Sequence, residues 1–383
     1  MTPLMRRGLE IATMCLASLA MVVRTATAQV GPANVYPPLD DTPNIRVGTV
    51  LFVDFTRTVA PPIPDADGNR VSPSAINVTR TYLNVTGQAN HLFAFRVTPD
   101  VVRETGPGSS LAGSETFRLK YGYLQVNLDD WLWRNTNARV GMIQTPYVDF
   151  EESVYRYRFQ GQIFAEREGF LPSSDFGASL RTLFPGGYGE VVGGLYNGEG
   201  YTRADPNDQK ALQIRGTLRP LPGPGLARGL RVTFFYDDDH YVRGAERART
   251  ISLVTYEHRF LNAGWVHLDA RDQRTRGDRT VASSGHSFWI TPRILLGIPP
   301  TAPPTAVTRA SVEGLLRYDR LEPDHATGGV KERFVAGVAY WPRLLTATVS
   351  TAFLMDYERV SYHAFPAVQP TERRIAIHML VGF

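Results

Sequence analysis

The sequence predicts an all-β chain that folds into a transmembrane antiparallel β-barrel of about 16 strands, with short periplasmic turns and long extracellular loops. Three observations lead to this fold class. The last residues alternate between apolar and more polar side chains, candidate strands recur along the chain with connections of alternating length, and an export segment precedes a chain without a long apolar helix.

The final strand carries the clearest alternation in the chain. One row is Ile375, Ile377, Met379, Val381 and Phe383, and the other is Arg374, Ala376, His378, Leu380 and Gly382. This period of two is typical of a strand with one apolar face. A terminal aromatic ring suits a membrane interface. The ending resembles the closing strand of bacterial outer-membrane barrels, which implies that Phe383 is a signal to the barrel assembly machinery.

Residues 1–28 have the features of a secretory signal peptide. Two arginines precede an apolar run over residues 11–23, and Ala26 and Ala28 form a small-residue cleavage pattern. The run is too short to span a bilayer as a stable helix. We therefore expect an exported chain whose location is the bacterial outer membrane.

The expected mature chain has a periplasmic N-terminal segment at residues 29–43 and the barrel at residues 44–383. Its only cysteine, Cys15, lies in the signal peptide. The mature chain then has no disulfide and no thiolate for catalysis or metal binding. It keeps 38 basic and 36 acidic residues, a net charge of +2 that is too small to indicate nucleic-acid binding.

The composition hides its membrane character. The chain is 43% hydrophobic with a mean hydropathy of −0.19, and no apolar run after the signal peptide reaches the ~20 residues of a membrane helix. A barrel produces this average because lipid-facing and lumen-facing residues alternate. A soluble β-sandwich or propeller would also alternate, but it would not explain the export segment and the terminal ring.

Candidate strands run from residues 45–57 to residues 372–383, and we expect long and short connections to alternate strictly between them. An even number of strands places both ends in the periplasm, where the first and last strands can pair. In residues 345–358 one row, with Phe353 and Met355, is suited to lipid. The opposite row, with Leu354 and Asp356, is expected to face a hydrated lumen.

Basic side chains recur on the rows predicted to face inward. The candidates for pore lining are Arg118, Lys120, Arg181, Arg215, Arg231, Arg293, Arg309, Arg317 and Arg333. Arginine rows along a water-filled lumen concentrate anions. Alternatively, each arginine pairs with an acid on a neighbouring strand and braces the wall.

Three segments in this order, residues 139–147, 174–179 and 194–201, resemble the phosphate-selective porin O/P family of bacterial outer-membrane porins. The resemblance implies a passive channel for small anionic solutes, often a homotrimer, in which the loop after the fifth strand folds into the pore. That loop is residues 146–173 here. The side chains expected at its constriction are Tyr155, Arg156, Tyr157, Arg158 and Arg167.

Other functions leave weaker signals. A barrel hydrolase would need a nucleophile and a base, for which Ser252 with His258 or Ser361 with His363 are candidates. A closed structural or adhesive barrel is a further alternative.

The run from Asp237 to His240 suits either a divalent cation or a solvated loop edge. We expect no enzyme activity, metal or cofactor, and the expected partners are outer-membrane lipid and lipopolysaccharide rather than nucleic acid.

Overall fold

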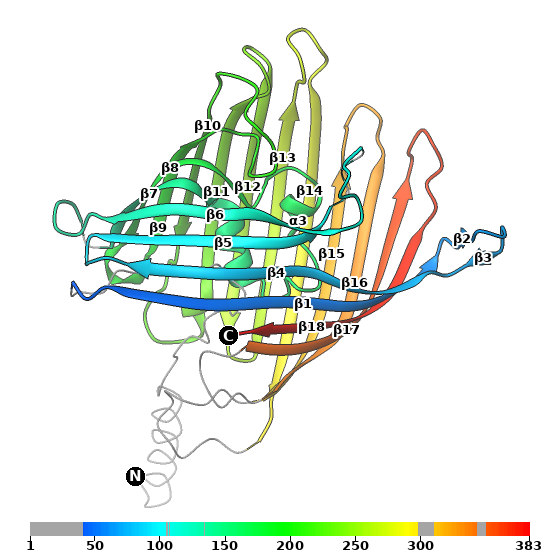
Figure 1. Cartoon of the computed structure of the whole chain (residues 1–383), viewed down its shortest axis with the longest axis horizontal. Helices are drawn as coiled ribbons and strands as arrows, with labels where there is room; N and C mark the ends of the chain where they lie inside the picture. Colours follow the sequence, from blue (N-terminus) through cyan, green and yellow to red (C-terminus); the bar gives the residue numbers. More distant parts are fainter. Residues whose placement is uncertain (1–40, 105, 107, 134, 298–309, 343–349) are drawn as a thin grey trace, which may run out of the picture.

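The computed structural model describes residues 41–104, 106, 108–133, 135–297, 310–342 and 350–383. Within them the strands form one closed antiparallel barrel of 16 strands, and β2 (Ile63–Pro64) and β3 (Arg70–Val71) form a small hairpin outside it (Figure 1). In chain order the barrel consists of β1 (Asn44–Ala60), β4 (Ser74–Gln88), β5 (Phe93–Arg103), β6 (Glu115–Asn127), β7 (Thr136–Gln144), β8 (Ser174–Phe184), β9 (Gly189–Tyr196), β10 (Ala211–Leu218), β11 (Leu230–His240), β12 (Glu246–His258), β13 (Leu261–Asp272), β14 (Val281–Leu295), β15 (Ser311–Glu322), β16 (Val330–Trp341), β17 (Ser350–His363) and β18 (Glu372–Gly382).

The barrel closes between its first and last strands, as the sequence predicts. β1 pairs antiparallel with β18, with Phe55 opposite Ile377. At the end of the seam, the Thr49 N–H donates to the Phe383 carbonyl at 2.7 Å, and the Phe383 N–H donates back to the Thr49 carbonyl at 3.0 Å. The last residue is therefore held by the wall through its backbone, while its ring is 66% exposed.

The outer surface of the wall is apolar. On β17, Phe353 and Met355 are 44% and 62% exposed, whereas Leu354 and Asp356 between them point inward and are buried. A surface lined in this way around a closed sheet is stable in lipid, which identifies the fold as a transmembrane barrel. None of the helices in the described part of the chain has the length and hydropathy that crossing a membrane requires.

The connections at the extracellular end are long in the first half of the chain. They cover residues 61–73, 104–114 and 145–173, whereas the periplasmic turns include residues 89–92 and 185–188. The expected strict alternation is wrong in the second half, because the periplasmic turn 219–229 is longer than the extracellular loop 241–245. Three prolines in the longer turn explain the exception, since proline cannot complete the hydrogen-bond ladder of a tight hairpin.

A bulge in β6 changes which side chains face the lumen. Thr98 of β5 is opposite Tyr121, but the next residue, Pro99, is opposite Leu119, so Lys120 is an extra residue in the ladder. Pro99 has no N–H to donate, which favours the irregularity at this position. Lys120 and Tyr121 therefore both point inward and are buried, although they are neighbours in sequence.

Candidate channel and its internal loop

The connection between β7 and β8 lies inside the barrel. It contains helix α2 (Pro146–Val154) and the short helix α3 (Phe164–Arg167), which Figure 1 shows enclosed by the strands. Pro146 occupies the first turn of α2, where its fixed φ and missing N–H are tolerated. We call residues 145–173 the internal loop. Its position after the fifth barrel strand agrees with the prediction for residues 146–173.

Aromatic side chains attach the internal loop to the wall formed by β11–β18. Tyr147 packs against Phe235 of β11, with 5.5 Å between ring centroids, and Tyr155 packs against Trp289 of β14 at 5.4 Å. The Phe164 ring lies where a Cβ on Gly285 would be only 2.5 Å away, so the glycine makes room for it. These residues belong to one buried apolar cluster that joins the loop to the wall.

This packing corrects one expectation. Ala352 and Leu354 belong to the inner row of β17 that was expected to face water, but they are 0% and 1% exposed and join the same apolar cluster. The prediction of which row faces inward is correct. The prediction that this row faces a hydrated lumen is wrong for Ala352 and Leu354, because the internal loop covers these side chains and excludes solvent.

The predicted constriction residues are buried and paired. Arg156 donates to Glu313 of β15 at 2.6 Å, and the Tyr157 hydroxyl donates to the same carboxylate at 2.9 Å. Arg158 donates to Glu152 at 2.5 Å, within the loop itself. The guanidinium carbon of Arg317 lies over Tyr155, 5.2 Å from the centroid of the Tyr155 ring. These side chains fix the loop to the wall or to itself rather than presenting free charge to the lumen.

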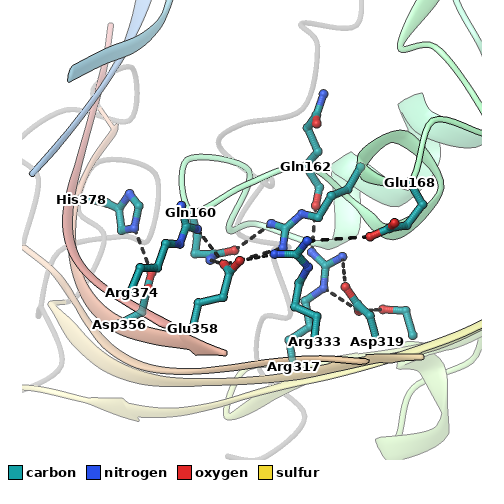
Figure 2. A network of polar contacts seen from close by, with 12 residues as sticks. Gln160, Gln162, Glu168, Arg317, Asp319, Arg333, Asp356, Glu358, Arg374 and His378 are labelled. Atoms are coloured by element: carbon teal, nitrogen blue, oxygen red, sulfur yellow. Dashed lines mark hydrogen bonds and ion pairs between the residues drawn. The ribbon is translucent and has the colours of Figure 1, made fainter. Parts of the chain in front are cut away.

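Arg167, the fifth predicted constriction residue, belongs to a polar network around Glu358 of β17. Figure 2 shows Glu358 with Gln160, Arg333 and Arg374. Glu358 accepts hydrogen bonds from Arg374 of β18 at 2.7 Å, from Gln160 of the loop at 3.2 Å and from Arg333 of β16, and Arg167 lies 3.8 Å away. Glu358 is 5% exposed and its contacts join three wall strands, β16, β17 and β18, to the loop.

A neighbouring group continues the network along the loop. Arg317 donates to both oxygens of Asp319 at 2.8 Å and to the backbone carbonyl of Gln162 at 2.8 Å (Figure 2). Lys331 donates to Glu168 at 2.7 Å. Arg317 was expected to line the pore, but it is 2% exposed beneath the loop, and Asp319 neutralises its charge locally.

The opposite wall, β4–β10, has a different charge balance. Its inward cations, Arg80, Arg96, Arg118, Lys120, Arg139, Arg181 and Arg215, outnumber its inward acids in the described residues, Asp100, Asp175 and Glu190. Two acids are shared, since Arg80 and Arg118 both reach Asp100, and Arg181 and Arg215 both reach Glu190.

Some cations of this wall are held by neutral groups. Lys120 donates to the Tyr82 hydroxyl at 3.2 Å and lies over that ring. Arg139 donates to Gln125 at 3.0 Å and lies 5.2 Å from the Tyr123 ring centroid. Neutral partners position a cation without cancelling its charge, so the wall itself keeps a positive excess, which Glu152 and Glu166 of the internal loop reduce near Lys120.

Helix α2 reaches this cationic wall. Phe150 lies under the guanidinium of Arg215, 4.7 Å from the ring centroid, and Asp149 lies within electrostatic range of Arg139, Arg181 and Arg215. Asp149 and Gln162 on the loop, and Arg118 and Arg181 on the wall, keep partial solvent exposure. Part of the water-accessible barrel interior therefore lies between the internal loop and the cationic wall, and partly exposed inward side chains such as Arg374 and Glu257 also remain on the other wall.

Of the remaining predicted lining residues, Arg231 and Arg293 lie on the wall β11–β18 rather than on the cationic wall. Arg231 pairs with Glu257, and Arg293 pairs with Glu313 at 2.5 Å, both on the wall that carries the loop. Arg309 lies outside the described residues. Acids on the inner face of β11–β18 thus neutralise its arginines, in pairs or through shared carboxylates such as Glu358, which agrees with the bracing alternative for these positions.

The candidates for other chemistries do not assemble into sites. Ser252 and His258, and likewise Ser361 and His363, show no hydrogen bond between them in the described structure, and His363 lies 3.1 Å from Glu332 instead. The run from Asp237 to His240 belongs to β11 rather than to a loop, so its side chains alternate between the two faces. Among the described residues, no group of three or more His, Cys, Asp or Glu is placed to hold a metal ion.

Comparisons with known proteins place this geometry among outer-membrane barrels. No family model and no curated protein matches the chain. An anion-selective porin from Comamonas acidovorans has a TM-score of 0.57 at 11% identity, over 89% of this chain and 100% of that chain. A loop L8 deletion mutant of OmpT, an outer membrane protein of Vibrio cholerae, gives 0.55 at 12% identity over 90% and 100%. The outer membrane channel DcaP of Acinetobacter baumannii gives 0.52 at 8% identity over 89% and 97%.

At these identities the likeness shows the fold. The chain has the same closed barrel as these outer-membrane proteins, and the similarity extends over most of each chain. The resemblance to the phosphate-selective porin O/P family is not specifically confirmed by any of them.

Proposed function

We propose that this protein is an outer-membrane porin that allows passive diffusion of small hydrophilic solutes and prefers anions such as phosphate. The observation that carries the proposal is the division of the lumen. The internal loop packs on the charge-balanced wall, β11–β18, whereas the partly exposed Arg118 and Arg181 of the cationic wall, β4–β10, border accessible space. The anion-selective porin and the channel among the similar structures support the same function.

The preference for anions would come from the field of the cationic wall rather than from a closed binding site. A unit charge 4 Å from a solute ion contributes about 1 kcal/mol in water and about 4 kcal/mol at the dielectric typical of a protein surface. Arg118 and Arg181 are partly exposed, so anions passing them gain an attraction that these values bound from above. The shared acids Asp100 and Glu190 reduce the field without cancelling it.

Bilayer conductance under a salt gradient tests both parts of the proposal. Purified protein should give discrete channels whose reversal potential favours the anion. Arg181→Glu should move the reversal potential toward the cation, whereas Arg320→Glu, on the outer face of β15, should leave it unchanged. A reversal potential that favours cations in the wild-type protein would contradict anion preference, and an absence of discrete channels would contradict the porin.

Three further proposals concern the ends of the chain and its assembly. We propose that residues 1–28 are the signal peptide, that Phe383 is recognised by the barrel assembly machinery and that the barrel forms a homotrimer. OmpT of Vibrio cholerae, one of the structures with this fold, is described in a trimer form. Crosslinking of the protein in native membranes, followed by mass determination of the crosslinked species, tests the trimer.

A further inference from the structure

Three arginines form a cluster on the outer surface of the barrel, at the seam where it closes. Arg359 lies on β17, Arg373 on β18 and Arg57 on β1, and all three are exposed. Arg359 and Arg373 are directly opposite each other in the strand register, and Arg57 is opposite Ile375, two residues from Arg373. We call these residues the outer arginine cluster.

The cluster is not neutralised by the protein. In the described part of the chain, none of the three guanidinium groups has a hydrogen-bond or ion-pair partner. Like charges directly opposite on adjacent strands have Cβ atoms about 4.5–5.5 Å apart and destabilise a sheet. Other outward arginines do not share this arrangement, because Arg320 pairs with Glu322 at 2.7 Å and Arg271 pairs with Glu246 at 3.2 Å.

The position of the cluster identifies the environment of an anion that would bind there. The outward residues on the periplasmic side of it are apolar, with Phe55 opposite Ile377 and Ile377 opposite Met355 across the same three strands. The cluster lies near the extracellular ends of these strands. It therefore occupies the boundary between the apolar band and the extracellular headgroup region.

We propose that the outer arginine cluster binds the phosphate groups of an outer-leaflet glycolipid, the chemistry of lipopolysaccharide, with the acyl chains packed on the apolar residues beneath it. Guanidinium groups match phosphate oxygens with paired hydrogen bonds, and a bound phosphate removes the repulsion between Arg359 and Arg373. Free phosphate would gain the charge contacts but none of the acyl packing, which is why a lipid is the favoured ligand.

The test compares lipid retention by full-length barrels in native mass spectrometry. The probe is lipid A with its two phosphates, and dephosphorylated lipid A is the matched ligand control. The double variant Arg359→Gln with Arg373→Gln should bind lipid A at least about tenfold more weakly, the loss expected when charge-assisted hydrogen bonds are removed. Arg320→Gln, an outward arginine that already has its acid, should bind as the wild type does.

Four outcomes would overturn the proposal. The first is equal binding of lipid A by the double variant and the wild type, and the second is equal binding of lipid A and its dephosphorylated form by the wild type. The third is a change in subunit number with unchanged lipid binding, which would make the cluster a contact between copies. Displacement of lipid A by an equal concentration of inorganic phosphate would replace the lipid with a phosphate-ion site. If the double variant does not fold, Arg57→Gln alone gives the same comparison.

Discussion

Glu313 is the residue whose change should release the internal loop. Its carboxylate is 1% exposed and accepts hydrogen bonds from Arg156 at 2.6 Å, from Tyr157 at 2.9 Å and from Arg293 at 2.5 Å. Glu313→Gln keeps the shape and one acceptor but removes the charge that both arginines need. Leaving a buried charge without its partner costs about 3–5 kcal/mol. We take the lower value because Arg293 retains some solvent contact.

A loss of about 3 kcal/mol in docking free energy raises the population of the released loop roughly 100-fold. Hydrogen–deuterium exchange of the amides in the internal loop reports this population directly. The Tyr155 amide, which donates to the Glu151 carbonyl at 2.7 Å, is a suitable reporter. Single-channel recordings of the same variant should show more current fluctuation, because the loop limits the accessible lumen.

Glu257→Gln is the matched control for this prediction. Glu257 is also an inward acid that pairs with an arginine of the adjacent strand, Arg231, but both lie on the wall away from the loop contacts. Its removal should leave exchange in the internal loop unchanged. Equal exchange in Glu313→Gln, Glu257→Gln and the wild type would refute the conclusion that buried ion pairs hold the loop in place.

Three further predictions concern the periplasmic end. Hydrogen bonds to Asp41 and then to Asp130 raise the pKa of His91 above its ordinary 6.5. The contribution of these contacts to stability is therefore complete below pH 6.5 and is lost as the pH rises through the raised pKa. NMR titration of the imidazole should show a lower midpoint after Asp130→Asn. Gly189→Ala should lower the refolding yield seen by gel mobility, because φ is +140° and a Cβ would lie 1.9 Å from the Thr217 carbonyl oxygen. Phe383→Ala should refold in vitro, since only backbone atoms join Phe383 to Thr49, but should lower the amount in cell membranes measured by immunoblotting.

The barrel could be predicted from the sequence because its signal is local. Alternation identifies the two faces of a strand without knowledge of its neighbours, and Phe353 and Leu354 indeed lie on opposite faces of β17. The closing pair of strands follows from an even strand count. The internal position of the loop was implied by the family resemblance, and this loop is the longest connection between barrel strands, lying between β7 and β8.

Pairing across the barrel could not be predicted in the same way. The contact between Arg156 and Glu313 joins residues 157 positions apart, and nothing near either residue indicates the other. The bulge at Lys120 depends on Pro99 of the neighbouring strand, so a period of two places Tyr121 on the wrong face. Whether solvent reaches an inner row depends on what covers it. Leu354 is buried because a loop that is far away in sequence packs over it.

The position of the loop also decides which charges a solute can meet. In the sequence, inward arginines from both walls contribute to one positive surplus. In the folded barrel, those under the loop, such as Arg317 and Arg333, are paired with Asp319 and Glu358 and removed from the lumen. The loop is itself held by those ion pairs. The acids that attach the loop therefore also neutralise the charge of that wall. Selectivity then depends on the uncovered wall, β4–β10, and substitutions there should change it while substitutions under the loop should change the stability of docking.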